Sequence, residues 1–177
     1  MMAFCTTLAA YELVWLAAVV GAGHGLAWPG AAAAALFAAG RLSVSPCRRI
    51  ELRLIAVTVA LAFVLEGLWV TSGLIAYSAP WPFPTAPLWL IALWVAFALT
   101  LVPLFGHLHG RPKLAALLGA VGGPLAYAGA ARGHALQFST PVWRSLAALS
   151  LGWAIALPAL TGLAARWVRQ SAAEAER

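Results

Sequence analysis

Five long apolar segments constrain the fold of this chain more than any other feature of its sequence. They cover residues 7–27, 52–73, 87–108, 113–131 and 142–165. Each has the length of about 20 residues that a helix needs to cross the hydrocarbon core of a bilayer. Inside that core the backbone must satisfy its own hydrogen bonds, so such segments fold as helices. The chain is therefore predicted to be an all-α, polytopic membrane protein.

The composition excludes a water-soluble domain. Hydrophobic residues make up 63% of the 177 residues and charged residues only 9%, whereas a soluble domain has about 25% charged residues. A small soluble domain also leaves too much of its surface exposed to hide this apolar content. The nine Trp residues are typical of membrane proteins, because the amphipathic indole prefers the bilayer interface.

A sixth segment, residues 29–43, is shorter. Fifteen helical residues reach roughly 20 Å, so this segment either spans thinly or is re-entrant. The connections between segments are short, which predicts one helical bundle of about six transmembrane helices over residues 1–177, without a soluble domain. The N-terminus has no basic residues and its apolar stretch contains Glu12, so we expect no cleaved signal peptide.

The basic residues predict the orientation, because cytoplasmic loops are enriched in Lys and Arg. With the loop over residues 44–51 inside, nine of the 11 basic residues are cytoplasmic: Arg41, Arg48, Arg49, Arg53, Arg111, Lys113, Arg166, Arg169 and Arg177. Only Arg132 and Arg144 are then outside. The C-terminus is predicted to be cytoplasmic, and the N-terminus too if residues 29–43 cross. The net charge of +6 comes without a nucleic-acid-reading motif, so anionic lipid is the expected partner and nucleic acid is not.

Neither a metal site nor a cofactor is predicted. The chain contains no Asp, and Cys5 and Cys47 lack CxxC spacing. His107 and His109 are two residues apart and would lie on different faces of a helix. Nucleotide-binding and hydrolase motifs are absent as well.

Glu66 is the most informative single residue. It lies about 18 Å into a hydrocarbon core of about 30 Å, where an ionisable group faces the bundle or a wet cavity. A small and polar stripe surrounds it at helical spacing: Thr58, Ala62, Glu66, Trp69 and Gly73. Two interpretations remain open, namely a protonated structural acid bonded to one neighbour, and a catalytic or transport group that exchanges a proton. Glu12, in contrast, lies about one turn inside the cytoplasmic end, where its side chain reaches water.

Prolines are expected to kink the fourth, fifth and sixth helices, at Pro103, Pro124 and Pro158. Because Pro124 has no N–H, the carbonyl of Ala120 loses its helical partner and must face protein or a cavity. The same helix carries a ridge that lets another helix approach closely, formed by Ala115, Gly119, Gly123 and Tyr127.

Depth counting brings several of these groups to one level. Trp69, Trp94 and Tyr127 come within a few ångströms of the depth of Glu66. With Pro124 and Ala120 they either line a ligand-binding pocket or form a hydrogen-bonded core. The loop over residues 73–89 has four prolines and no charge, and we expect an extended crossing with aromatic anchors at the interface.

The stretch "PLWLIALWVAFALTLVPLFGHLHGRPKLAALLGAVGGPLAYAGA", residues 87–130, resembles the bacterial membrane family known as domain of unknown function 2878. "YELVWLAAVVGAGHG" and "LEGLWVTSG" are similar to that family too, so the likeness covers most of the chain. The resemblance implies a small polytopic protein of the bacterial inner membrane, with an acidic residue at position 66 and no assigned activity. The genes that accompany the family imply lipid modification or a response to membrane stress.

The leading functional prediction is a membrane-embedded protein that binds or helps to modify an acyl lipid, with Glu66, Trp69, Trp94 and Tyr127 at the site. Two other classes remain open. One is a small proton-coupled transporter that uses Glu66 beside the Pro124 break. The other is a non-catalytic scaffold for soluble lipid-modifying enzymes. A lipid site predicts a lateral opening between helices, and a transporter predicts a cavity open to water. The sequence predicts no oligomeric state.

Overall fold

The computed structural model describes residues 2–175, and within them the chain folds into an all-α bundle, as predicted. The helices are α1 (Met2–Gly23), α2 (Trp28–Val44), α3 (Arg48–Thr71), α4 (Leu88–Thr100), α5 (Pro112–Arg132) and α6 (Val142–Ala175). A 3₁₀ turn, η1 (Gly106–Leu108), and two short strands, β1 (Ile75–Tyr77) and β2 (Leu136–Phe138), complete the fold. Arg177, which the sequence places on the cytoplasmic side, lies outside the described residues.

Several helices have the length and composition of membrane spans. Within the described part of the chain they are four: Phe4–Gly23, Arg48–Thr71, Pro112–Arg132 and Val142–Glu174. The segment predicted at 29–43 forms α2, whose 17 residues reach about 25 Å. α4 is apolar but shorter still, at 13 residues. The protein is thus a multi-pass membrane protein built from long and short helices.

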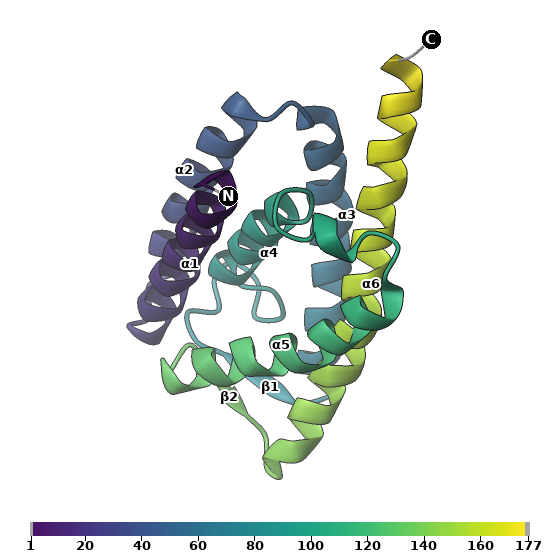
Figure 1. The fold of residues 1–177 in the computed structure, drawn as a ribbon. Helices are drawn as coiled ribbons and strands as arrows, with labels where there is room; N and C mark the ends of the chain where they lie inside the picture. Colours follow the sequence, from purple (N-terminus) through teal and green to yellow (C-terminus); the bar gives the residue numbers. More distant parts are fainter. Residues whose placement is uncertain (1, 176–177) are drawn as a thin grey trace.

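α4 is the central element of the bundle. It packs against α1 and α2 on one side and against α3 on another, with α6 beyond α3 (Figure 1). Apolar residues surround it on all faces, among them Trp89, Leu93 and Trp94, which are buried. A helix that is hydrophobic all round belongs in the interior. α5 crosses the face of this arrangement from α6 towards the end of α1 (Figure 1).

α4 ends earlier than the sequence predicts. One helix with a kink at Pro103 is expected over residues 87–108, whereas the structure ends α4 at Thr100 and continues in turns and η1. Pro103 has no N–H to donate, and the Thr100 hydroxyl donates a 2.6 Å hydrogen bond to the Phe97 carbonyl. Both features compete with the helical ladder. α5 and α6, in contrast, continue through Pro124 and Pro158.

Two strands close one end of the bundle, which we call the sheet end. β1 and β2 pair antiparallel, with Tyr77 opposite Leu136, so the loop expected to be an extended crossing begins as a strand. Side chains alternate along a strand, and in β1 Ile75 and Tyr77 are buried while Ala76 is exposed. Further along the loop, Trp81 is 65% exposed, and its role as an interfacial anchor stays a prediction.

Candidate functional site

The polar stripe of α3 faces the interior of the bundle, as its spacing predicts. Thr58, Ala62 and Glu66 have no exposed surface and Trp69 is 2% exposed. Gly73 is the exception, because it lies beyond the end of α3 at a positive φ of 68° and is exposed. Glu66 is therefore a fully buried carboxyl group on a helix with the length and composition of a membrane span.

Three side chains donate hydrogen bonds to Glu66. The indole Nε1 of Trp94 donates to Oε1 at 2.8 Å, and the Tyr127 hydroxyl donates to the same oxygen. The Tyr77 hydroxyl donates to Oε2. The donors come from α4, α5 and β1, whereas the acceptor is on α3. One carboxyl group thus connects four elements that are far apart in the sequence, and we call this group of four residues the Glu66 cluster.

Under the structural interpretation of the sequence, Glu66 was expected to bond to one neighbour, whereas in the structure it accepts hydrogen bonds from three. An indole N–H can only donate, while a phenol can both donate and accept. A carboxylate accepts all three bonds. If the carboxyl group carries a proton, the hydroxyl of one of the two tyrosines must turn and accept a hydrogen bond from the protonated oxygen. The geometry therefore gives a proton on Glu66 two possible partners, Tyr77 and Tyr127.

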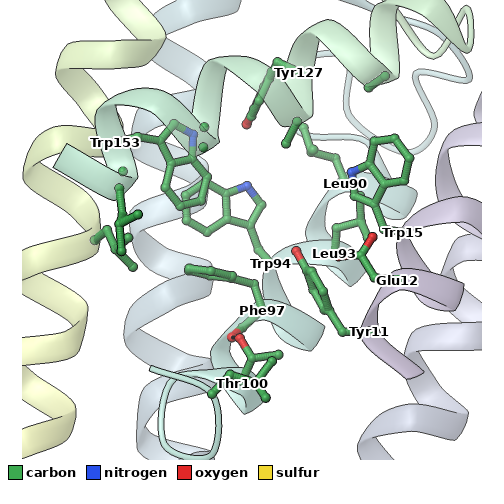
Figure 2. Close-up of a pocket in the computed structure, with 18 of the residues that line it drawn as sticks. Tyr11, Glu12, Trp15, Leu90, Leu93, Trp94, Phe97, Thr100, Tyr127 and Trp153 are labelled. Atoms are coloured by element: carbon green, nitrogen blue, oxygen red, sulfur yellow. Dashed lines mark hydrogen bonds between the residues drawn. The ribbon is translucent and has the colours of Figure 1, made fainter. Parts of the chain in front are cut away.

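A cavity of about 370 Å³ lies next to the Glu66 cluster, between α1, α4, α5 and α6 (Figure 2). Its lining is mostly aliphatic and aromatic. Four side chains bring oxygen atoms to it, namely Tyr11, Glu12, Thr100 and Tyr127. Trp94 and Tyr127 belong to both the lining and the cluster. Ligand pockets usually combine an apolar lining with a few placed polar groups.

Aromatic rings build the wall that faces α1. Trp94 and Trp153 stack with ring centroids 4.8 Å apart and planes 10° apart, and Phe97 meets Trp153 edge-on at 5.3 Å. The glycine ridge of α5 makes room for this wall. A Cβ on Gly123 would lie 2.3 Å from Cδ1 of Trp153, and a Cβ on Gly119 would lie 2.2 Å from its carbonyl oxygen. The ridge that the sequence predicts for helix contact thus receives Trp153.

The cavity opens between α1 and α5. These helices meet near the sheet end, where a Cβ on Gly133 would lie 2.5 Å from Val19, and they make few other contacts. Farther from the sheet end, residues of both helices line the cavity and are also exposed: Leu8 and Glu12 on α1, and Leu118, Gly122 and Ala126 on α5. Both helices are long and apolar enough to span a membrane, so the opening lies on a face that a membrane would cover.

The residues predicted for the site occupy different places. Trp94 and Tyr127 line the cavity, whereas Glu66 lies behind them. Trp69 is buried with its ring edge-on to Tyr127 at 5.7 Å. The Ala120 carbonyl was expected to face protein or a cavity because Pro124 has no N–H; it faces α6 and accepts a 2.6 Å hydrogen bond from the Ser150 hydroxyl.

Sequence reasoning missed Tyr77, Tyr11 and Trp153, and it read Glu12 only as a surface residue. Tyr77 lies in a segment whose apolar residues show no helical spacing, so the sequence did not predict that its side chain faces the interior. The spacing of Gly119 and Gly123 indicated a close partner but did not identify it.

Two other polar groups lie away from the cavity. Arg41 on α2 and Glu51 on α3 form an ion pair of 2.6 Å, and Glu51 is fully buried.

His107 is hydrogen-bonded through Nδ1 to the Leu104 carbonyl at 3.0 Å. Partial burial, Arg169 and His107 lower the pKa of His109. No group of three or more His, Cys, Asp or Glu side chains suited to a metal gathers within residues 2–175.

The family model described as "Protein of unknown function (DUF2878)" matches residues 5–159, and the chain belongs to this family. The matched range contains the Glu66 cluster and the lining of the cavity. No curated protein and no solved structure matches the chain.

Proposed function

We propose that this membrane protein binds an acyl lipid in the cavity between α1, α4, α5 and α6. The observation that carries the proposal is the opening between α1 and α5, two helices that have the length and composition of membrane spans. A lipid can enter such a site sideways from the bilayer, without passing through water.

The shape and chemistry of the cavity support a chain-like ligand. Its lining follows α4 from Trp89 to Thr100, a distance of about 16 Å at 1.5 Å per residue. Leu90, Leu93 and Phe97 lie between these ends. An acyl chain would gain dispersion contacts with the rings and methyl groups along this length.

The two rival classes fit this geometry less well. A proton-coupled transporter that uses Glu66 needs a wet path to that group, whereas Trp94 and Tyr127 separate Glu66 from the cavity. A scaffold for soluble enzymes needs no cavity within the bundle. Soluble lipid-modifying enzymes remain proposed partners of the cytoplasmic face, and the inner membrane remains the proposed location.

Chemistry on the bound lipid is a second proposal, and one contact favours it. The Tyr127 hydroxyl donates to Glu66 while its side chain lines the cavity. When Glu66 carries a proton and Tyr127 turns to accept a hydrogen bond from it, the Tyr127 hydroxyl proton is free to point at a ligand. Tyr127 can then give this proton to the ligand and take the proton of Glu66, which leaves Glu66 as a carboxylate. In this scheme Glu66 acts as the proton donor and Tyr127 connects it to the lipid.

Blocking the opening tests the lipid site. Gly122 is exposed at the opening, and a Cβ there would meet no atom within 4 Å, so Gly122→Leu fills the opening without a backbone clash. Gly162 on α6 has the same open space and is exposed, but does not line the cavity. Mass spectrometry of the gently purified protein should detect a retained lipid in the native chain and in Gly162→Leu, and much less in Gly122→Leu. Equal lipid retention in all three proteins would contradict the proposal.

A further inference from the structure

We infer that the cavity selects a long-chain lipid whose polar end carries a protonated amine, and that Glu12 is the residue that holds this amine. The inference rests on the proposed function and names the class of lipid.

Glu12 is the one carboxyl group of the described helices that lies at the cavity. Figure 2 shows it beside Tyr11 on α1, across the cavity from Trp94 and Trp153. The other oxygen atoms of the lining are already engaged, except that of Tyr11. The Thr100 hydroxyl donates to the Phe97 carbonyl, and the Tyr127 hydroxyl donates to Glu66. Among the side-chain oxygens of the lining, those of Glu12 and Tyr11 thus remain to hold the polar end of a ligand, while the Trp153 indole N–H, which has no partner among the described residues, can only donate.

The charges of the described residues leave Glu12 without a counterion. Glu66 accepts three hydrogen bonds, and Glu51 is paired with Arg41. Within residues 2–175, the structure gives the Glu12 carboxylate neither an ion pair nor a hydrogen bond, and the cavity lining contains no Lys, Arg or His.

A lipid that fills the opening displaces water from the exposed Glu12 carboxylate, which is costly unless the lipid itself neutralises the charge. An ammonium group supplies both the opposite charge and N–H donors. A hydroxyl group supplies a donor without the charge, and a carboxylate or phosphate is repelled. The charge balance of the cavity therefore favours an amine over an alcohol, and an alcohol over an acid.

Three probes of equal chain length test this order: octadecylamine, octadecanol and octadecanoate. Each is titrated at neutral pH into the full-length protein in a neutral detergent, and binding is measured by native mass spectrometry. The native protein should bind the amine about tenfold more tightly than the alcohol and the acid most weakly. Glu12→Gln should lower the affinity for the amine to that for the alcohol and leave the alcohol unchanged. Glu174→Gln, an exposed Glu near the end of α6, should behave as the native protein.

The outcomes separate the two proposals. Equal binding of all three probes to the native protein would overturn the amine selectivity while the lipid site stands. A preference for the amine that survives in Glu12→Gln would overturn the role of Glu12. Binding of none of the probes would count against the proposed function itself. The comparison of probes on the native chain needs no variant, so a poorly folded Glu12→Gln protein would not block the test.

Discussion

The indole of Trp94 donates a 2.8 Å hydrogen bond to Glu66, a residue 28 positions earlier in the chain. The same indole stacks on Trp153 in the wall of the cavity. The bond therefore connects a fully buried carboxyl group to the surface that a ligand would touch. It fixes the Trp94 ring, and with it the shape of the cavity at its centre.

This contact predicts different effects for two substitutions of Glu66. Glu66→Leu leaves three donors without an acceptor, and an unsatisfied buried group costs about 1–3 kcal/mol. We expect this variant to lose about 3 kcal/mol or more of unfolding free energy. Glu66→Gln keeps one oxygen for Trp94 and Tyr127, while its amide N–H can donate to Tyr77, so a loss of about 1 kcal/mol is expected.

Reversible unfolding in detergent micelles measures both values. Glu174→Leu serves as the control, because this exposed position should stay within about 0.5 kcal/mol of the native protein. A Glu66→Leu protein as stable as the native chain would show that the three hydrogen bonds contribute nothing to stability.

The helical hydrogen bond that Pro124 removes from α5 gives a second prediction, which uses Ser150 and Pro124. The Ser150 hydroxyl supplies the donor that the Ala120 carbonyl lacks because of Pro124. Ser150→Ala should cost about 1 kcal/mol of unfolding free energy in the native chain. With Pro124→Ala, the new N–H of residue 124 reaches the Ala120 carbonyl, and the cost of Ser150→Ala should fall close to zero.

A double-mutant cycle in the same micelles gives the coupling energy, expected at about 1 kcal/mol. Ser171→Ala, at an exposed position of α6, controls for the loss of a serine. Additive effects of the two substitutions would mean that the Ser150 hydroxyl does not replace the missing helical bond.

The sequence predicts the helical bundle well because apolar length is a local property. The α3 stripe and the inward position of Glu66 follow from helical spacing alone, and so does the need of the Ala120 carbonyl for a non-helical partner. Depth counting also brings Tyr127 and Trp94 to the level of Glu66, and both donate to it.

Other features depend on contacts between distant residues and could not be predicted. Tyr77 reaches Glu66 because β1 pairs with β2, about 60 residues farther along the chain. The cavity exists because α1 and α5 meet near the sheet end and separate elsewhere, a relationship that no local pattern encodes. The apolar segment predicts a helix that continues to residue 108, but the effects of Thr100 and Pro103 together end α4 at Thr100.

Topology gives a third prediction, from the two cysteines. The count of basic residues places Cys47 in the cytoplasm, and Cys5 too if α2 crosses the membrane. α1 and α2 lie side by side (Figure 1), which favours a crossing. A membrane-impermeant maleimide added to intact spheroplasts should label neither cysteine until the membrane is opened. Phe83→Cys, at a 56% exposed position of the predicted outer loop, should be labelled at once. Labelling of Cys47 in intact spheroplasts would reverse the orientation.

The most direct test of the lipid site is photocrosslinking with an acyl lipid that carries a diazirine along its chain. Leu93 and Phe97 line the cavity, and Leu93 is only 8% exposed. Leu151 and Ile155, at 67% and 71% exposure, lie on the outer face of α6. After illumination in membranes, peptide mass spectrometry should find crosslinks at Leu93 and Phe97 as well as on the outer face, and Gly122→Leu should lose only those in the cavity. Crosslinks confined to outer positions such as Leu151 and Ile155 would contradict a lipid in the cavity.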